Sequence, residues 1–160
     1  MYECYKMRRR VFISTAYEDA NQARGFKLLS WNPNVDFEFV TRDLLTPVDS
    51  RDPDYIKSSI RDQLHGTSVT VVLIGQTTHQ SQWVPWEAEE SIARGNGIIG
   101  IRLKGQDDAP IPQVLKDAGA KIINWDTDTF SDEIEKAALI AGRPELGPAP
   151  ARSVGSSGCR

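Results

Sequence analysis

The sequence is poor in the residues that hold metals or form disulfide bridges. Its two cysteines, Cys4 and Cys159, lie near opposite ends of the 160-residue chain. Its two histidines, His65 and His79, have no cysteine or histidine at a spacing typical of zinc ligands. We therefore predict two free thiols in a reducing compartment, no structural disulfide and no metal site.

The chain also lacks long apolar runs and an excess of positive charge. No segment is apolar over the length that crosses a bilayer. The net charge of −3 gives no reason to expect binding to nucleic acid or to an anionic membrane surface. The first residues contain no apolar core of a secretion signal. These absences predict a cytoplasmic protein with neither a nucleic-acid nor a membrane partner.

What the chain does contain is typical of one globular domain, with 39% hydrophobic and 26% charged residues. Short apolar runs alternate with segments of helical periodicity, and this alternation predicts an α/β fold with a parallel sheet. The predicted strands are residues 11–14, 35–40, 69–74, 97–103 and 121–125. The predicted helices are residues 18–29, 53–64, 82–93, 114–118 and 126–140.

Two of these strands suggest the order of the sheet. Residues 69–74 are almost continuously apolar, which predicts a central strand, whereas residues 35–40 alternate as an edge strand does. We expect a flavodoxin-like three-layer sandwich, with five parallel strands in the order 2-1-3-4-5 and helices on both faces. The domain is placed at residues 9–141. A lead-in, residues 1–8, precedes it, and a tail predicted to be disordered, residues 142–160, follows.

One familiar motif matches in letters only. Residues 95–100 read G-x-G-x-x-G, but the dinucleotide fingerprint follows a strand and opens a helix, whereas this segment ends a helix and enters a strand. We instead predict a helix C-cap at Gly95 and close packing at Gly97 and Gly100. The chain has no P-loop motif, and Gly75-Gln76 stands where a phospho-receiver would need its acceptor aspartate.

The segment between Ser81 and Glu87 is the best candidate for a site. Ser81 can cap the helix, Pro85 suits its first turn, and Trp83 and Glu87 lie four residues apart on its flank. The apolar stripe of this helix is predicted to comprise Val84, Ala88 and Ile92. Two interpretations stay open. A first-turn glutamate can simply complement the helix dipole beside packing tryptophans, or an acid and an aromatic ring can meet where open α/β sheets bind ligands.

Several segments together resemble a TIR-like domain of the prokaryotic branch that includes the sensor enzyme of the Thoeris antiphage system. The resemblance covers about residues 9–140. It rests on Val11–Ser14 with Tyr17 and Asp19 close behind, on Thr41–Leu44, and on Val71–Gly75 followed by Ser81-x-Trp83-Val84-x-x-Glu87. The chain departs from the usual turn at Thr15-Ala16.

The resemblance implies an enzyme that consumes NAD⁺ as its substrate and needs no cofactor. Catalytic TIR domains cleave the bond between nicotinamide and ribose, and they release ADP-ribose or cyclise it into a signalling nucleotide. Glu87 matches the family's catalytic glutamate. The residues that the resemblance places around the substrate are Ser14, Thr15, Tyr17, Asp19, Asp43, Ser81 and Trp83.

The resemblance also implies partners. Catalytic TIR domains self-associate, and the loop Thr41–Asp52 is the candidate to complete a neighbouring site. Because no effector domain is encoded here, a separate effector protein would sense the product during antiphage defence. The alternative is a non-catalytic adaptor that acts only through TIR–TIR contacts. Adaptors commonly lack the acid that this chain has at Glu87.

Overall fold

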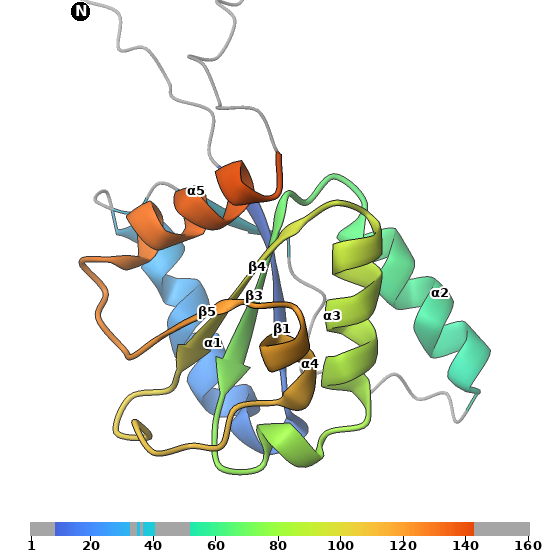
Figure 1. Cartoon of the computed structure of the whole chain (residues 1–160), viewed down its shortest axis with the longest axis horizontal. Helices are drawn as coiled ribbons and strands as arrows, with labels where there is room; N and C mark the ends of the chain where they lie inside the picture. Colours follow the sequence, from blue (N-terminus) through green and yellow to red (C-terminus); the bar gives the residue numbers. More distant parts are fainter. Residues whose placement is uncertain (1–8, 33–34, 36, 41–51, 143–160) are drawn as a thin grey trace, which may run out of the picture.

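A parallel sheet between two layers of helices forms the part of the chain that the computed structural model describes, residues 9–32, 35, 37–40 and 52–142 (Figure 1). The strands are β1 (Arg9–Thr15), β2 (Phe37–Val40), β3 (Val69–Ile74), β4 (Gly97–Arg102) and β5 (Lys121–Ile123). The helices are α1 (Ala20–Leu28), α2 (Pro53–Leu64), α3 (Trp83–Ala93), α4 (Gln113–Asp117) and α5 (Phe130–Ile140). Three short 3-10 turns accompany them: η1 (Tyr17–Asp19), η2 (Leu29–Trp31) and η3 (Thr78–Gln80).

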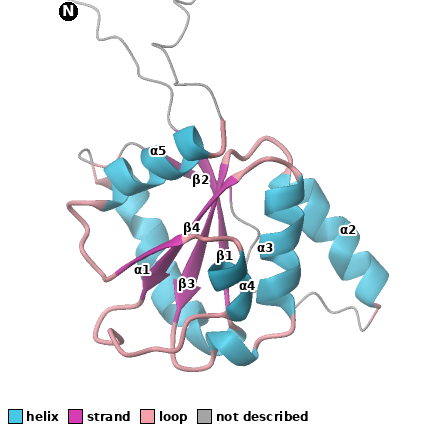
Figure 2. Cartoon of the chain, viewed as in Figure 1, coloured by secondary structure: helices cyan, strands magenta, loops and turns pink. Residues whose placement is uncertain are grey.

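The sheet, magenta in Figure 2, is parallel throughout, and its strands run in the order β2-β1-β3-β4-β5. This is the order that the sequence predicted, and the α/β class is confirmed. All six residues of β3 are buried, as expected for a central strand, and β2 lies at an edge. The predicted lead-in (residues 1–8), almost all of the predicted tail and both cysteines lie outside the described residues.

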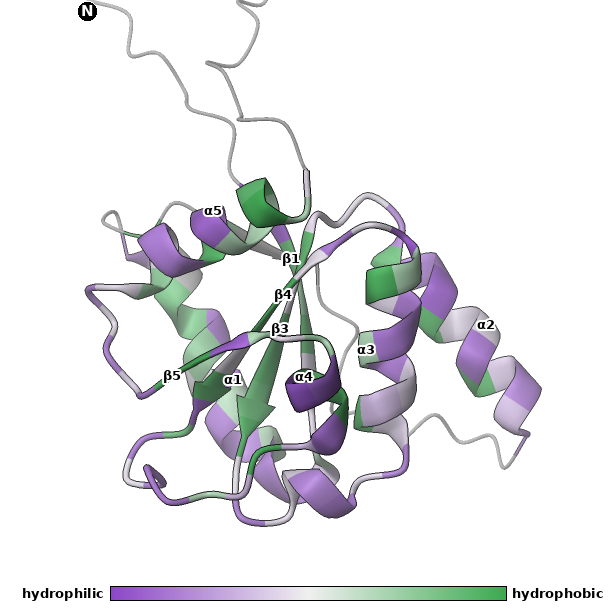
Figure 3. Ribbon diagram, in the orientation of Figure 1, coloured by the Kyte–Doolittle hydropathy of each residue, from purple (hydrophilic) through white to green (hydrophobic). Residues whose placement is uncertain are grey.

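Side-chain alternation divides the core between the two faces of the sheet. On one face, β1, β3 and β4 pack against α1 and α5, with Phe26 and Phe130 at the centre. On the other face, α3 and α4 cover Val72 and Ile74 of β3, and α2 and α3 cover Phe12 of β1. Figure 3 shows the apolar strands between helices whose outer sides are hydrophilic. α1 and α3 therefore lie on opposite faces of the sheet.

Two predicted helix starts were wrong because local turns precede the helices. Residues 17–19 form the 3-10 turn η1, and α1 begins only at Ala20. α5 begins at Phe130 rather than at residue 126, because the Asp126 carboxylate accepts the amide of Asp128 at 3.1 Å and its carbonyl accepts the amide of Thr129 at 3.1 Å. The start of α2 is as predicted, with Asp52 accepting the amide of Asp54 at 3.0 Å.

The glycines after α3 and at the start of β4 are structural, as predicted. Gly95 has φ 77° and follows the last turn of α3, where the amides of Gly95 and Asn96 bond back to the carbonyls of Ile92 and Ser91 at 2.9 and 3.0 Å. This is a Schellman motif, which favours glycine at the left-handed position. At Gly97, α5 approaches so closely that an added Cβ would lie only 2.9 Å from the amide nitrogen of Ala138.

In the described part of the chain, no helix has both the length and the apolar character needed to cross a bilayer.

The close approach of α5 to β4 predicts opposite effects at two glycines. Gly97→Ala should lower the free energy of unfolding by about 1–3 kcal/mol or more, because the clashing atoms belong to the backbone of α5 and cannot rotate away. Gly25→Ala in α1 should leave it unchanged or raise it by up to about 1 kcal/mol, since nothing lies within 4 Å of its added Cβ. Urea unfolding of both variants measures the difference, and equal stabilities would contradict the packing described here.

Candidate functional site

The order of the strands creates a natural place for a site between β1 and β3. These strands are neighbours in the sheet, but the chain leaves β1 toward α1 on one face and leaves β3 toward α3 on the other. The segments that follow the two strands therefore separate at the carboxyl edge. Such a switch point is where open α/β sheets bind ligands.

Glu87 projects from α3 into this region and is only 6% exposed. Its carboxylate oxygen Oε2 accepts a hydrogen bond from the hydroxyl of Ser14, which is fully buried near the end of β1. The structure thus brings together two of the predicted site residues. Glu87 is the fifth residue of α3, and no acidic residue lies in the first turn. Complementing the helix dipole from the first turn therefore does not explain Glu87.

The buried face of α3 differs from the predicted stripe. Ile92 was expected to be buried but is 41% exposed. The prediction failed because it followed hydropathy alone, whereas half of the true face is polar. The buried residues, spaced at i, i+3, i+4 and i+7, are Val84, Glu87, Ala88 and Ser91.

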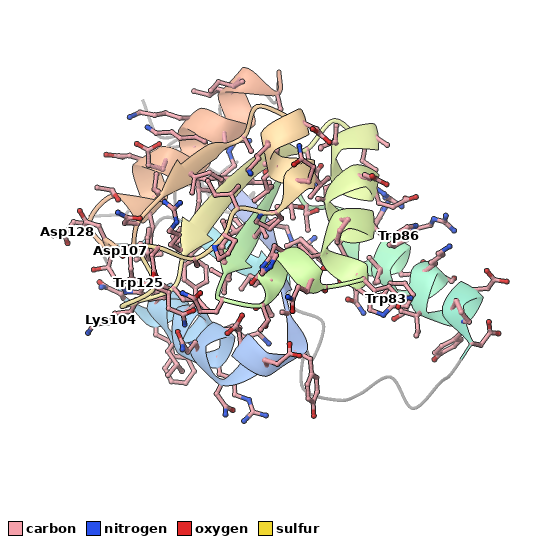
Figure 4. All side chains as sticks on the ribbon, turned by 60° about the horizontal axis from the view of Figure 1, so that its bottom comes forward. Trp83, Trp86, Lys104, Asp107, Trp125 and Asp128 are labelled. Carbon is pink, nitrogen blue, oxygen red and sulfur yellow. The ribbon has the colours of Figure 1, made fainter. Side chains whose placement is uncertain are left out.

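Ser81 and Trp83 hold the start of α3. The Ser81 hydroxyl accepts the amides of Trp83 and Val84 at 3.3 Å each, which is the capping role predicted for it, although the helix itself begins at Trp83. Trp83 packs with the buried cluster of Phe12 and Ile60. Its ring lies edge to face with that of Trp86, with the ring centroids 6.3 Å apart. In Figure 4 both tryptophans lie beside α2. A contact between Trp83 and substrate stays a prediction.

Asp19 forms a second buried polar cluster at the same edge of the sheet. The hydroxyl of Thr78 donates to Asp19 Oδ2 at 3.4 Å and accepts the amide of Gly75 at 2.7 Å. A side chain at Gly75 would displace the carboxyl group of Asp19, because an added Cβ would lie 2.7 Å from the Asp19 carboxyl carbon. Burial raises the pKa of Asp19, and this outweighs the bond from Thr78, which lowers it; the nearby charge of Glu18 raises it further. Asp19 thus fastens the turn after β1 onto the end of β3.

The remaining predicted substrate-binding residues are Thr15, Tyr17 and Asp43. Thr15 is partly buried, and its hydroxyl contacts the carbonyl of Ala16 at 3.4 Å. Tyr17 is 77% exposed. Asp43 lies outside the described residues.

Within the ranges that the structure describes, no three His, Cys, Asp or Glu residues are grouped so as to hold a metal ion.

The sequence did not predict a role for three hydroxyl residues that lie beside the site, Thr70, Thr78 and Ser91. Thr78 supports Asp19, as described above. Ser91, fully buried, donates to the backbone carbonyl of Glu87 at 2.7 Å and accepts from Thr70 of β3, also at 2.7 Å. A signal was present, because Thr70 interrupts the apolar run of β3 and Ser91 lies one helical turn after Glu87.

The raised pKa of Asp19 predicts a pH-dependent effect of Asp19→Asn. The folded state binds the proton of Asp19 more tightly than the unfolded chain does, so its contribution to stability is lost as the pH rises through the folded pKa. Asp19→Asn has no proton to release at this position, so its free energy of unfolding does not fall with the titration of Asp19. Its free energy of unfolding, relative to that of the natural chain, should therefore increase between about pH 4 and about pH 7.

Urea unfolding over this pH range measures the divergence. Asp62→Asn, at an exposed position of α2, is the matched control and should run parallel to the natural chain. Parallel curves for Asp19→Asn would show that burial of its charge does not cost stability.

Comparison with known proteins shows which family this chain belongs to. Residues 12–108 match the family described as "Thoeris protein ThsB, TIR-like domain". Over 107 residues the chain is 34% identical to "Putative cyclic ADP-D-ribose synthase ThsB1" of Bacillus cereus (strain MSX-D12). That alignment covers 64% of this chain but 55% of the relative, so the chain corresponds to about half of the relative's length.

A solved structure, that of the Clostridium botulinum CMP N-glycosidase BcmB, has 14% sequence identity and a TM-score of 0.45, covering 82% of this chain and 99% of that chain. This similarity is too low to bear on the site. The family match, by contrast, covers more than half of the chain and contains Ser14, Asp19 and Glu87. The chain therefore belongs to the TIR-like domain family of the Thoeris protein ThsB.

Proposed function

We propose that this chain is a TIR-type enzyme that cleaves the nicotinamide–ribose bond of NAD⁺ and yields ADP-ribose or a cyclic ADP-ribose signal in antiphage defence. The observation that carries the proposal is the carboxylate of Glu87, buried at the switch point of the sheet and hydrogen-bonded by Ser14. Membership of the ThsB family and the name of the Bacillus cereus relative support it.

One carboxylate suffices for this chemistry. Nicotinamide leaves as a neutral ring from a cationic precursor, so no general acid has to protonate the leaving group, whereas ordinary glycosidases need two carboxylates. As the bond breaks, positive charge develops on the ribose. The Glu87 carboxylate would stabilise this charge and accept hydrogen bonds from ribose hydroxyls.

The surroundings of Glu87 would strengthen the effect. A charge that is shielded from water interacts more strongly with the charge that develops in the transition state. The bond from Ser14 fixes the direction of the carboxylate before substrate arrives, so little reorganisation is needed during the reaction. Hydrolysis or cyclisation would then depend on whether water or the adenine of the same molecule reaches the ribose carbon first.

Glu87→Gln tests the proposal because it keeps the size of the side chain and removes its charge. We expect the rate of nicotinamide release from NAD⁺ to fall by about 10²-fold or more. Ser14→Ala should lower the rate less, by about tenfold, since it removes the orienting bond and leaves the charge. Chromatography and mass spectrometry of the products measure the rates and identify the co-product.

The matched control is Glu89→Gln, a carboxylate of the same helix that is exposed to solvent. It should retain the natural rate, and circular dichroism should show all variants folded. Full turnover by folded Glu87→Gln would rule out the catalytic role. A natural chain that releases no nicotinamide at any concentration would favour the adaptor.

We further propose that the active form is a self-assembled one and that a separate effector protein responds to the product. The loop expected to reach a neighbouring site, Thr41–Asp52, lies outside the described residues except for Asp52. If a neighbouring chain completes each site, nicotinamide release per protomer should rise with protein concentration and level off once assembly is complete. A specific activity that stays constant over a dilution of about a thousandfold would count against assembly.

A further inference from the structure

A short series of buried hydroxyl contacts joins β3 to α3 directly behind the candidate site. Thr70 Oγ1 donates to Ser91 Oγ at 2.7 Å, and Ser91 Oγ donates to the carbonyl oxygen of Glu87 at 2.7 Å. Thr70 and Ser91 are both fully buried. The backbone of Glu87 is thus tied to β3, while its side chain is tied to β1 through Ser14.

Both ties lie on the same face of the sheet. Side chains alternate along a strand, so Phe12 and Ser14 of β1 face α3, as do Thr70 and Val72 of β3. In the register of the two strands, Ser14 lies opposite Val72 and Phe12 lies opposite Thr70. The Thr70 contact is therefore two residues below the level at which Ser14 meets Glu87.

The Ser14–Glu87 and Thr70–Ser91 contacts are separated by similar distances along the sheet and along α3. Four residues of α-helix, from Glu87 to Ser91, rise about 6 Å. Two residues of strand, from the level of Ser14 to that of Thr70, rise about 6.6 Å. When Ser91 meets Thr70, Glu87 is therefore at the height of Ser14. A shift of α3 by one residue would break both contacts.

We propose that Thr70 and Ser91 are positioning residues, which set the height of α3 on the sheet and thereby hold the carboxylate of Glu87 against Ser14. The inference rests on the proposed function for its effect on turnover. The arrangement of the carboxylate can also be measured without turnover. Neither residue touches substrate in this scheme.

The chain offers a matched control that separates positioning from stability. Thr67 is also a buried threonine with two hydrogen bonds, donating to the carbonyl of Leu64 at 2.6 Å and accepting from the side-chain Nδ2 of Asn96 at 2.9 Å. It lies just before β3, at the opposite edge of the sheet from Glu87. Thr67→Val and Thr70→Val remove the same group from two positions three residues apart at the start of β3. The Thr70 hydroxyl donates to Ser91 of α3, whereas the Thr67 hydroxyl bonds to Leu64 and Asn96.

The experiment compares Thr70→Val, Thr70→Ser and Thr67→Val with the natural chain. We expect Thr70→Val to lower kcat for NAD⁺ cleavage by about tenfold with KM nearly unchanged, because the chemical group is displaced and not removed. Thr70→Ser keeps the donor and should restore most of kcat. Thr67→Val should retain kcat even where its unfolding midpoint falls as far as that of Thr70→Val.

The second measurement is the ¹³C resonance of the Glu87 carboxyl carbon, assigned with Glu87→Gln. It should move in Thr70→Val, return in Thr70→Ser and stay in place in Thr67→Val. An unmoved resonance in Thr70→Val, or an equal loss of kcat in Thr67→Val, would overturn the positioning role. A natural chain without NAD⁺ cleavage would count against the proposed function, and the resonance would then decide the positioning role alone.

Discussion

A carboxylate buried on the inner face of a helix is the constraint on which the rest of this domain depends. An unpaired buried charge is strongly unfavourable, so Glu87 needs a donor that the core itself must supply. Ser14 is that donor, and it requires α3 to lie across the end of β1 and not over β3 alone. Position 14 must then be small, buried and hydroxylic, directly after the apolar residues Phe12 and Ile13, which pack on opposite faces of the sheet. A local requirement of one side chain thus sets the path of a helix.

The topology explains why the two sides of this contact can meet. β1 and β3 are adjacent, yet their following helices cover opposite faces, so the carboxyl edge between them is not closed by a crossover. The turn after β1 returns to this edge from one face, where Asp19 lies over Gly75, and α3 arrives from the other with Glu87. The absence of a side chain at Gly75 is therefore as necessary to the arrangement as the presence of the two acids.

Most of the fold could be predicted from the sequence, because it depends on features that hydropathy and turn chemistry reveal. The apolar run of β3, the Asp52-Pro53 start of α2 and the glycine after α3 are local signals, and the structure agrees with all three. The inner face of α3 could not be predicted in this way. Glu87 and Ser91 count as outward-facing on any hydropathy scale, and their partners, Ser14 and Thr70, are distant in sequence. Ile92 was placed inside for the same reason. The sequence pattern made Glu87 part of a candidate segment, and the resemblance assigned it the catalytic role. Its burial became evident only from tertiary structure.

At the amino edge of the sheet, the buried guanidinium of Arg9 is paired with Glu135, with 2.6 Å between the two side chains. Before β3 begins, Thr67 and Asn96 bond to each other, and neither carries a charge that burial would penalise. At the carboxyl edge two carboxylic acids are buried beside hydroxyl groups, and at Asp19 burial raises the pKa, which means that the charged form opposes folding. Replacing such groups by apolar residues commonly stabilises a protein. A sequence under pressure for stability alone would not concentrate both acids at the switch point of its sheet. Their placement there is what selection for chemistry at that edge would produce.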